Sequence, residues 1–268
     1  MKFPLDHDLH LHSVQSLCCR DPEMTPAHIL QYGQAHGYRT LCLTDHVWSK
    51  NVPMPAPNDF YVPQTVGHIR ESLPLPQADG APRFLFGAET DFCQCGGEAL
   101  GLTRAECDAL DFVVIPINHF HMTGFTRPAD CASPEQIAEL LTHRLERLLD
   151  FDLPWTKVGL AHFTCGLTYP NGDEYEVFDR LDRTRVFRAF SELARRGAGI
   201  ELNAGCFLHW RDDPERHLWP YRLAKDAGCR FYCASDAHMV RALDAIPILL
   251  PDVVDELGLT EQDLFLLP

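Results

Sequence analysis

Short apolar runs alternate with amphipathic segments along the chain, and this alternation predicts strands and helices in turn. Runs typical of buried strands occupy residues 39–44, 83–86, 111–117, 157–161, 198–202, 230–234 and 246–250, after an opening strand that ends near His10. Helices are expected at residues 27–36, 63–73, 137–151, 177–196 and 214–227. Strands that alternate with helices about seven times, without an internal linker, indicate an α/β fold built as one parallel barrel.

The boundaries of these elements have their own signals. Thr25 and Pro26 form a helix start and Gly37 a helix stop, while Ser133 with Gln136 predicts a second cap. Other segments lack a helical pattern: residues 47–62 and 164–173 are expected to be loops, 90–103 a hairpin or excursion, and 251–268 a helical tail. We therefore expect residues 1–268 to form a single domain.

Composition narrows the class of protein. The 268 residues are 46% hydrophobic, contain 11 Cys and carry a formal net charge of -15. No apolar run approaches the roughly 18 residues of a membrane span, and the first residues lack the apolar core of a signal peptide. An odd number of scattered Cys fits reduced thiols, so we expect a cytoplasmic protein. The negative charge argues against a stable nucleic-acid partner, because phosphate backbones are bound mainly by Lys and Arg.

Most predicted strands end in a side chain that can bind a metal ion. The opening strand ends in His10 and His12, whose i, i+2 spacing places both on one face. Later strand ends carry further candidates: Asp45 and His46, Glu89, His119 or His121, His162, and Asp236 with His238. The active sites of barrel enzymes form at the carboxyl ends of several strands. The regular placement of these candidate ligands at strand ends therefore predicts a metal centre at that end of the barrel.

The order of these motifs resembles the polymerase and histidinol phosphatase superfamily, known as the PHP domain. The four matching motifs are Asp8-x-His10-x-His12-Ser13, Thr44-Asp45-His46, Gly87-x-Glu89 and Ser235-Asp236-x-His238. His119 and His162 stand where the family has two intermediate ligands. The resemblance covers essentially the whole chain. It implies a distorted (β/α)7, TIM-like barrel with two or three divalent metal ions at its mouth.

The resemblance also implies a set of ligands. His10, His12, Glu89 and Asp236 would hold one ion, Glu89, His119 and His162 a second, and His46 and His238 would contribute to a third. For that third site Asp21 is the expected replacement of a family ligand, with Cys18 or Cys19 as alternatives. His119 and His121 are both candidates for the ligand that follows the strand at 111–117, and His119 is favoured. Imidazole and carboxylate ligands suit Zn, Mn or Fe.

The expected activity is that of a metal-dependent phosphatase. A hydroxide bridging two ions would attack phosphorus, with Glu89, Asp236 and His238 as the catalytic residues. Asp8 and Asp45 either orient ligand imidazoles or bind backbone at strand ends. The substrate would be a small phosphomonoester, with histidinol phosphate, a nucleotide or a sugar phosphate as candidates.

Four residues are candidates for substrate binding. Guanidinium groups bind phosphate in a bidentate manner, and the resemblance implies an Arg clamp after the strand at 198–202. The candidates are Arg211, Arg216, Arg241 and His121. The alternative for each Arg is an ion pair with a neighbour such as Asp212 or Glu215.

Two other functions stay open at this point. One is a nuclease, or a nucleotide phosphatase directed to 5′-phosphates, which would need a basic, aromatic track for a strand. The other is a metal-binding structural or regulatory module without activity. The sequence gives no indication of the oligomeric state.

Overall fold

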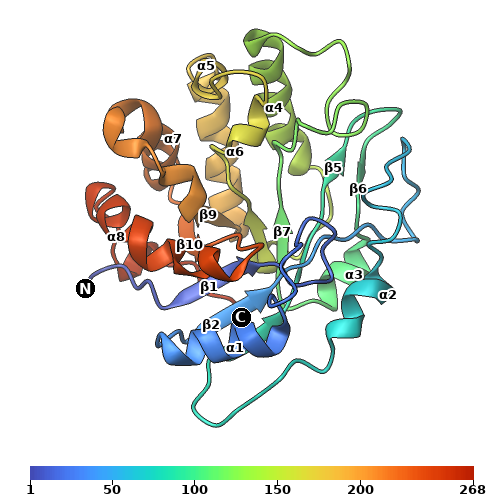
Figure 1. Ribbon diagram of the computed structural model, residues 1–268. Helices are drawn as coiled ribbons and strands as arrows, with labels where there is room; N and C mark the ends of the chain where they lie inside the picture. Colours follow the sequence, from blue (N-terminus) through green and yellow to red (C-terminus); the bar gives the residue numbers. More distant parts are fainter.

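Parallel strands with helices between them form the frame of the protein, and the computed structural model describes residues 1–268 (Figure 1). Hydrogen bonds group the main strands into two parallel sheets. The three-stranded sheet has the order β1-β2-β3, from strands β1 (His7–Leu11), β2 (Thr40–Leu43) and β3 (Arg83–Phe86). The five-stranded sheet has the order β10-β9-β8-β7-β4, from β4 (Ala88–Glu89), β7 (Val113–Ile115), β8 (Val158–Leu160), β9 (Gly199–Asn203) and β10 (Arg230–Ala234).

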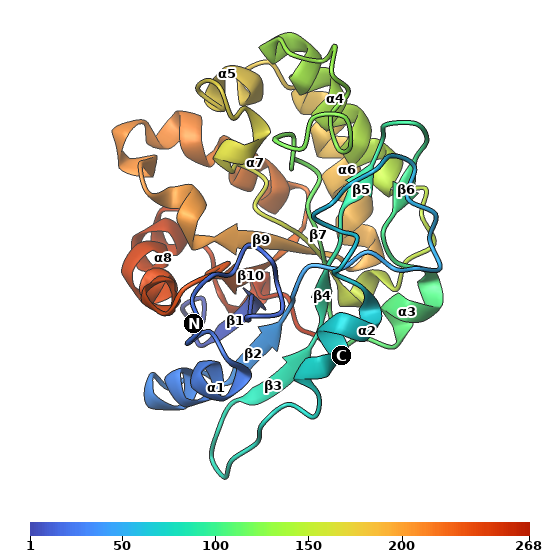
Figure 2. The ribbon, with the colours of Figure 1, turned by 45° about the vertical axis from the view of Figure 1, so that its right-hand side comes forward.

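The edge strands of one sheet meet the edge strands of the other on both sides. Residues 83–89 pass from one sheet to the other at Gly87, where a side chain would lie 2.5 Å from the carbonyl oxygen of Phe112. At the other end, the amide of Asp236 donates to the carbonyl of His10 at 2.9 Å. The strands in Figure 2 accordingly follow one another around a common centre. The expected closed barrel is nevertheless not found, because no ladder joins β1 to β10, and the only bridge there is the isolated pair Leu11–Ala237, three residues beyond the end of β10.

Helices cover the outside of the strands (Figures 1 and 2). They are α1 (Pro26–Ala35), α2 (Val66–Ile69), α3 (Arg104–Asp108), α4 (Pro134–Leu148), α5 (Tyr175–Phe178), α6 (Arg183–Arg196), α7 (Pro214–Asp226) and α8 (Ala245–Glu256). The expected caps are present: the Thr25 side chain accepts from the amide of His28, and Ser133 with Gln136 forms a capping box. The expected hairpin is formed by β5 (Phe92–Cys93) and β6 (Ala99–Leu100).

The structure departs from the predicted elements in three places. The expected strand at 246–250 is the first half of helix α8. The expected helical tail at 251–268 is helical only as far as Glu256, after which it contains the 3-10 turn Glu261–Asp263. A short apolar run has no periodicity that separates a strand from a buried helix. The expected helix 177–196 is interrupted, since the Asp182 side chain accepts from the amides of Thr184 and Arg185 and starts α6 anew.

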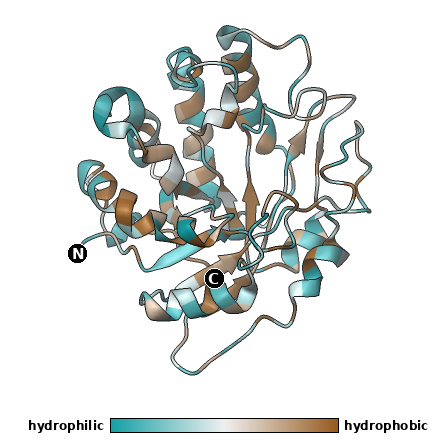
Figure 3. Cartoon of the chain, in the orientation of Figure 1, coloured by the Kyte–Doolittle hydropathy of each residue, from teal (hydrophilic) through white to brown (hydrophobic).

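The core lies between the strands and the helices. One cluster of 58 buried apolar residues extends from Phe3 to Leu259. Figure 3 shows β7 in the brown of hydrophobic residues, whereas β1 is largely teal, because its sequence is His-Asp-Leu-His-Leu. A buried strand that carries polar side chains is unusual and marks β1 as part of a polar site. No helix is long and apolar enough to cross a membrane, and all 11 cysteines are free thiols.

Gly159 in β8 offers a test of this packing. A Cβ atom there would lie 2.4 Å from the Tyr232 hydroxyl and 2.5 Å from Cζ of Phe112, both fully buried. We expect Gly159→Ala to lower the free energy of unfolding by about 1–3 kcal/mol, measured by urea denaturation. Gly67→Ala, whose Cβ would meet nothing nearer than 3.7 Å, is the control and should leave stability within about 0.5 kcal/mol. Equal stabilities for the two variants would contradict this account of the core.

Candidate metal centre

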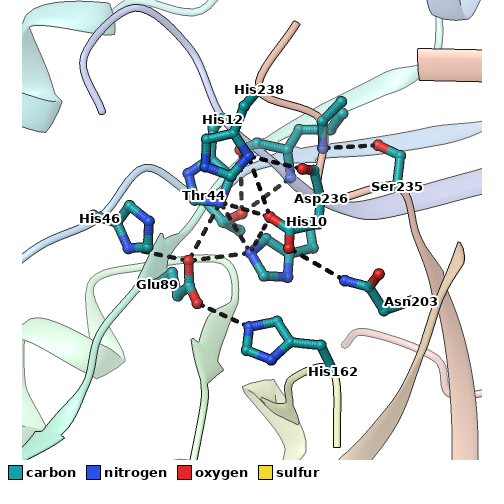
Figure 4. Close-up of polar contacts among 12 residues, drawn as sticks. His10, His12, Thr44, His46, Glu89, His162, Asn203, Ser235, Asp236 and His238 are labelled. Carbon is teal, nitrogen blue, oxygen red and sulfur yellow. Dashed lines mark hydrogen bonds and ion pairs between the residues drawn. The ribbon is translucent and has the colours of Figure 1, made fainter. Parts of the chain in front are cut away.

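Imidazoles from the ends of four strands, β1, β2, β7 and β8, converge on Glu89 in β4, which is 1% exposed; Figure 4 shows most of them. Its Oε2 lies 3.1 Å from Nδ1 of His46, 3.2 Å from Nε2 of His10 and 3.3 Å from Nε2 of His12. Its Oε1 lies 3.4 Å from Nε2 of His162 and 3.7 Å from Nε2 of His119. Glu89 thus places one oxygen toward each of two groups of imidazoles, as expected for a carboxylate shared by two ions.

Three groups of possible ligands result, in each of which the donor atoms lie within 4.8 Å of one another. They are His10, His12 and Glu89; Glu89, His119 and His162; and His12, His46 and His238. The structure therefore brings together Glu89 and the imidazoles that the sequence predicted for three ions. Their roles as ligands stay a prediction.

Asp236 and His238, which follow β10, complete the cluster. Oδ1 of Asp236 lies 3.2 Å from Nε2 of His12 and 3.5 Å from Nε2 of His10. The ring of His238 stacks on His12 with centroids 4.1 Å apart. Asp236 and His162 both have a positive φ, of 53° and 23°. Such backbone strain costs of order 1 kcal/mol and is concentrated at functional sites.

A hydrogen-bond acceptor holds Nδ1 of most of these imidazoles. The acceptor is Glu201 for His10 at 2.9 Å, Ser16 for His12 at 3.0 Å, Asp91 for His119 at 2.9 Å, Asn118 for His162 at 3.2 Å and the carbonyl of Asp236 for His238 at 2.8 Å. Ser16 and Asn118 act as acceptors because their own donors are used by Asp45 and by the carbonyl of His162. This network places the proton on Nδ1 and leaves Nε2 of each ring free to bind a cation.

The residues fit a cluster of divalent ions. When each ring carries its single proton on Nδ1, as in a metal-ligating imidazole, Nε2 of His10 and Nε2 of His12 face each other at 3.0 Å with lone pairs that a cation can bind. His46 is 5% exposed, and its Nδ1 makes no well-aligned hydrogen bond, although it lies 3.1 Å from Oε2 of Glu89. A cation between these lone pairs would satisfy them, and imidazoles with carboxylates are ligands of Zn, Mn and Fe.

The pKa values of the buried groups also favour a bound cation. Burial lowers the pKa of His12, but hydrogen bonds to Asp236 and Glu89 outweigh it and raise that pKa to about 9. Burial raises the pKa of Glu89, but the charges of His46 and His10 hold it well below its usual value. The carboxylates thus stay charged and require positive charge beside them, which divalent cations would supply.

Several residues of this network were missed by the sequence analysis. Glu201, which is fully buried, accepts from the Tyr232 hydroxyl at 2.8 Å as well as from His10. Asp91 and Asn118 hold His119 and His162. A signal was present in two cases, because Asp91 stands two residues after Glu89 and Glu201 two before Asn203, so each shares a face with a polar side chain at a strand end.

The two remaining acidic candidates do not contact an imidazole. Asp8 accepts from the amides of His10 and Ser235, so it binds backbone at the strand ends. Asp45 accepts from Ser13 and Ser16, and only through Ser16 does it reach His12.

The structure does not bring Asp21 to the cluster. Its carboxylate accepts from the amides of Glu23 and Val240 at 3.0 Å each, which turns it toward the backbone of its own loop and of the loop after β10. Cys19 donates to the carbonyl of His238. Cys18, by contrast, lines the cavity over the cluster together with His46, Glu89 and His238.

The predicted arginines have different surroundings. Arg211 is paired with Asp252, and Arg216 with Asp179 at 2.8 Å and Asp173 at 3.2 Å, so their charges are already compensated. Arg241 forms no ion pair with a carboxylate and lines a cavity of about 490 Å³ together with Cys18, Asp21 and His238. Arg20, which the sequence analysis did not single out, lines the same cavity. Free guanidinium groups are therefore found beside His238 rather than after β9.

A cavity of about 680 Å³ lies over the cluster. The expected loops contribute to its wall, with Pro57 to Phe60 from the first and Leu167 from the second. His121 also lines it, 5.3 Å from the ring of His119, and burial together with the charge of His119 lowers its pKa to about 4. His119 therefore faces Glu89 while His121 faces the cavity, as the sequence analysis favoured.

Comparison with known proteins gives structural relatives. No protein-family model and no curated protein matches the sequence. The histidinol phosphate phosphatase of Lactococcus lactis, solved with zinc, L-histidinol and phosphate, is 16% identical, with a TM-score of 0.65 over 94% of both chains. The putative histidinol phosphatase of Listeria monocytogenes is 13% identical, with a TM-score of 0.57 over 88% of this chain and 97% of that chain. This chain shares their fold.

The metal centre can be tested through stability. Zinc at about 100 times its Kd stabilises a protein by about 2.7 kcal/mol, so adding it to chelator-treated protein should raise Tm by about 5 °C or more. Glu89→Gln should lose most of that shift, and His143→Gln, which removes a half-exposed imidazole on α4, should keep it. The measurement is differential scanning fluorimetry. An unchanged Tm on addition of zinc or manganese to the wild type would contradict a metal site.

Proposed function

We propose that this protein is a metal-dependent phosphatase of small phosphomonoesters, with histidinol phosphate as one candidate substrate and nucleotide or sugar phosphates as others. The observation that carries the proposal is the set of imidazoles with Nδ1 held by an acceptor and Nε2 directed at a shared, buried carboxylate. The shared fold with a phosphatase solved with zinc and phosphate supports it. We also propose that the two sheets act as one distorted seven-stranded barrel, in which β3 and β4 form one continuous strand, and that the protein is cytoplasmic.

The side chains would divide the work as follows. Two or three divalent ions would be held by the three groups, with Asp236 beside His10 and His12. His12 occurs in two of the groups but would bind one ion only, through Nε2, because Ser16 holds its Nδ1. When bound, such ions polarise a phosphoryl oxygen and lower the pKa of the water that attacks phosphorus. Glu89 would fix the spacing of the first two groups, and Asp236 would hold His12 in place. His238, with its proton on Nδ1, would present the lone pair of Nε2 to the cavity, where it would help to hold the third ion or accept a proton from the attacking water.

Arginines beside His238 would bind the phosphate. A protein with a net charge of -15 repels an anion at long range, so the attraction has to come from local groups. Arg241 lines the cavity next to His238 without a carboxylate partner, and Arg20 lies on the same cavity. His121 and the wall from Pro57 to Phe60 would contact the organic part of the substrate.

The proposal predicts both metal content and turnover. Elemental analysis of the purified protein should give at least two transition-metal ions per chain, and a screen of histidinol phosphate, nucleotides and sugar phosphates should give hydrolysis with added Mn or Zn. Glu89→Gln should keep the fold and lower kcat by at least about 10³-fold, because charge stabilisation at the reacting phosphoryl group is lost. Fewer than two ions per chain, together with no turnover of any phosphoester, would exclude the proposed activity.

Arg241 and Arg211 give a second test. Arg241→Ala should lower kcat/KM for the best phosphomonoester about 10- to 100-fold, mainly through KM, because a hydrogen bond to a charged group contributes about 1.5–3 kcal/mol. Arg211→Ala should have a smaller effect, since Asp252 already compensates its charge. Arg188→Ala, on the exposed face of α6, is the control. The reverse order of effects would place the phosphate after β9, as the sequence alone implied.

A further inference from the structure

Tyr61 lies in the cavity loop, residues 47–62, of which Pro57 to Phe60 line the cavity. It contacts Asp91, the hydrogen-bond partner of the candidate metal ligand His119. It is 1% exposed and packs against Trp48 and Phe125, with ring centroids 5.7 Å and 5.8 Å away. Its hydroxyl donates to Oδ2 of Asp91. The same oxygen accepts from Nδ1 of His119 at 2.9 Å. One carboxylate oxygen therefore joins a residue of the cavity loop to an imidazole of the metal centre.

Asp91 has no other anchor for its side chain. The carboxylate is fully buried, and its second oxygen, Oδ1, has no hydrogen-bond partner. The backbone of Asp91 is fixed separately, since its carbonyl accepts from the amide of Gly101 at 3.1 Å. The rotation of the carboxylate consequently depends on the two donors at Oδ2, Tyr61 and His119.

The backbone of His119 is also fixed independently. The Thr126 hydroxyl donates to the carbonyl of His119, and buried Arg144 donates to the carbonyl of Ile117 at 3.3 Å. What these contacts leave free is the orientation of the imidazole ring. Asp91 is the hydrogen-bond partner that holds this ring, so a loosely held carboxylate would allow Nε2 to turn away from Glu89.

Tyr61 also stabilises the turn that forms part of the cavity wall. Its amide donates to both the carbonyl and the side-chain oxygen of Asn58, at 3.1 Å each, which closes the turn over residues 58–61. Asn58, Asp59 and Phe60 of this turn line the cavity. The turn and the metal ligand therefore share a single hydrogen-bonded junction.

We propose that Tyr61 is a positioning residue of the metal centre: its hydroxyl, acting through Asp91, fixes the ring of His119 and links the cavity loop to the ion held by Glu89, His119 and His162. This inference rests on the proposed function, because it requires that ion to bind. Partners of this kind behind a metal-ligating imidazole typically contribute 10- to 100-fold in metal affinity.

The test removes only the hydroxyl. Tyr61→Phe keeps the aromatic ring and its packing, so a purely structural role would leave metal binding unchanged. Protein loaded with zinc is mixed with a chromophoric chelator, and the release of each equivalent is followed. We expect one equivalent to bind about 10- to 100-fold more weakly in Tyr61→Phe while the others are retained. With cobalt in place of zinc, the visible absorption of the same equivalent should change, a readout that does not depend on activity.

Tyr38→Phe is the matched control. The Tyr38 hydroxyl is also buried but has no hydrogen-bond partner, so its removal should leave zinc release as in the wild type. A Tyr61→Phe protein with the release profile of the wild type overturns the inference. A wild type that binds fewer than two ions overturns the proposed function instead, and the inference with it.

A double variant tests the route through Asp91. In Asp91→Asn the link is already altered, so adding Tyr61→Phe should weaken zinc binding by no more than twofold beyond Asp91→Asn alone. Fully additive losses would show that Tyr61 acts by another route and would overturn the inference. If Tyr61→Phe fails to fold, Asp91→Asn decides alone, since wild-type zinc retention in that variant would exclude the link.

Discussion

A buried carboxylate surrounded by imidazoles is the constraint on which the rest of this structure depends. Glu89 is almost fully buried, and an unpaired charge in such a place is very unfavourable. The fold compensates it with histidines that arrive from the ends of β1, β2, β7 and β8. Those strands must end at the same level and on the same side, which only a parallel arrangement provides. The polar strand β1 and the strained backbone of His162 and Asp236 are consequences of this requirement.

The glycine at position 87 is a further consequence of placing Glu89 among imidazoles from both sheets. Glu89 has to lie at the junction of the two sheets to face imidazoles from both, and residues 83–89 reach that junction by leaving β2 and joining β7. At the crossing, the chain passes so close to the carbonyl of Phe112 and the thiol of Cys42 that a Cβ atom would not fit. The motif Gly87-x-Glu89 therefore combines a steric requirement with a chemical one, two residues apart.

The sequence predicted the parts of the site that depend on local pattern. Apolar runs located the strands, and the residues after them located His10, His12, Glu89, His119 and His162. It could not predict what depends on partners distant in the chain. Arg211 and Arg216 resembled phosphate ligands until the structure placed Asp252, Asp173 and Asp179 beside them. The sequence could not show that the Asp21 carboxylate accepts a hydrogen bond from the amide of Val240, because the two residues are 219 positions apart in the chain.

The supporting residues show why ligands are easier to predict than the groups that orient them. A ligand must stand at a strand end, whereas an acceptor for Nδ1 needs only to reach the ring from behind. Here that role is filled by a carboxylate inside β9, a serine after β1, an amide after β7 and an aspartate after β4, with no common spacing. The two carboxylates among these groups are themselves held by a further donor, Tyr232 for Glu201 and Tyr61 for Asp91. The hydrogen-bond network of the candidate metal centre therefore extends two hydrogen bonds beyond the imidazole rings, into the core on one side and into the cavity loop on the other. Under the proposed function, a change in this loop would also change the support of His119.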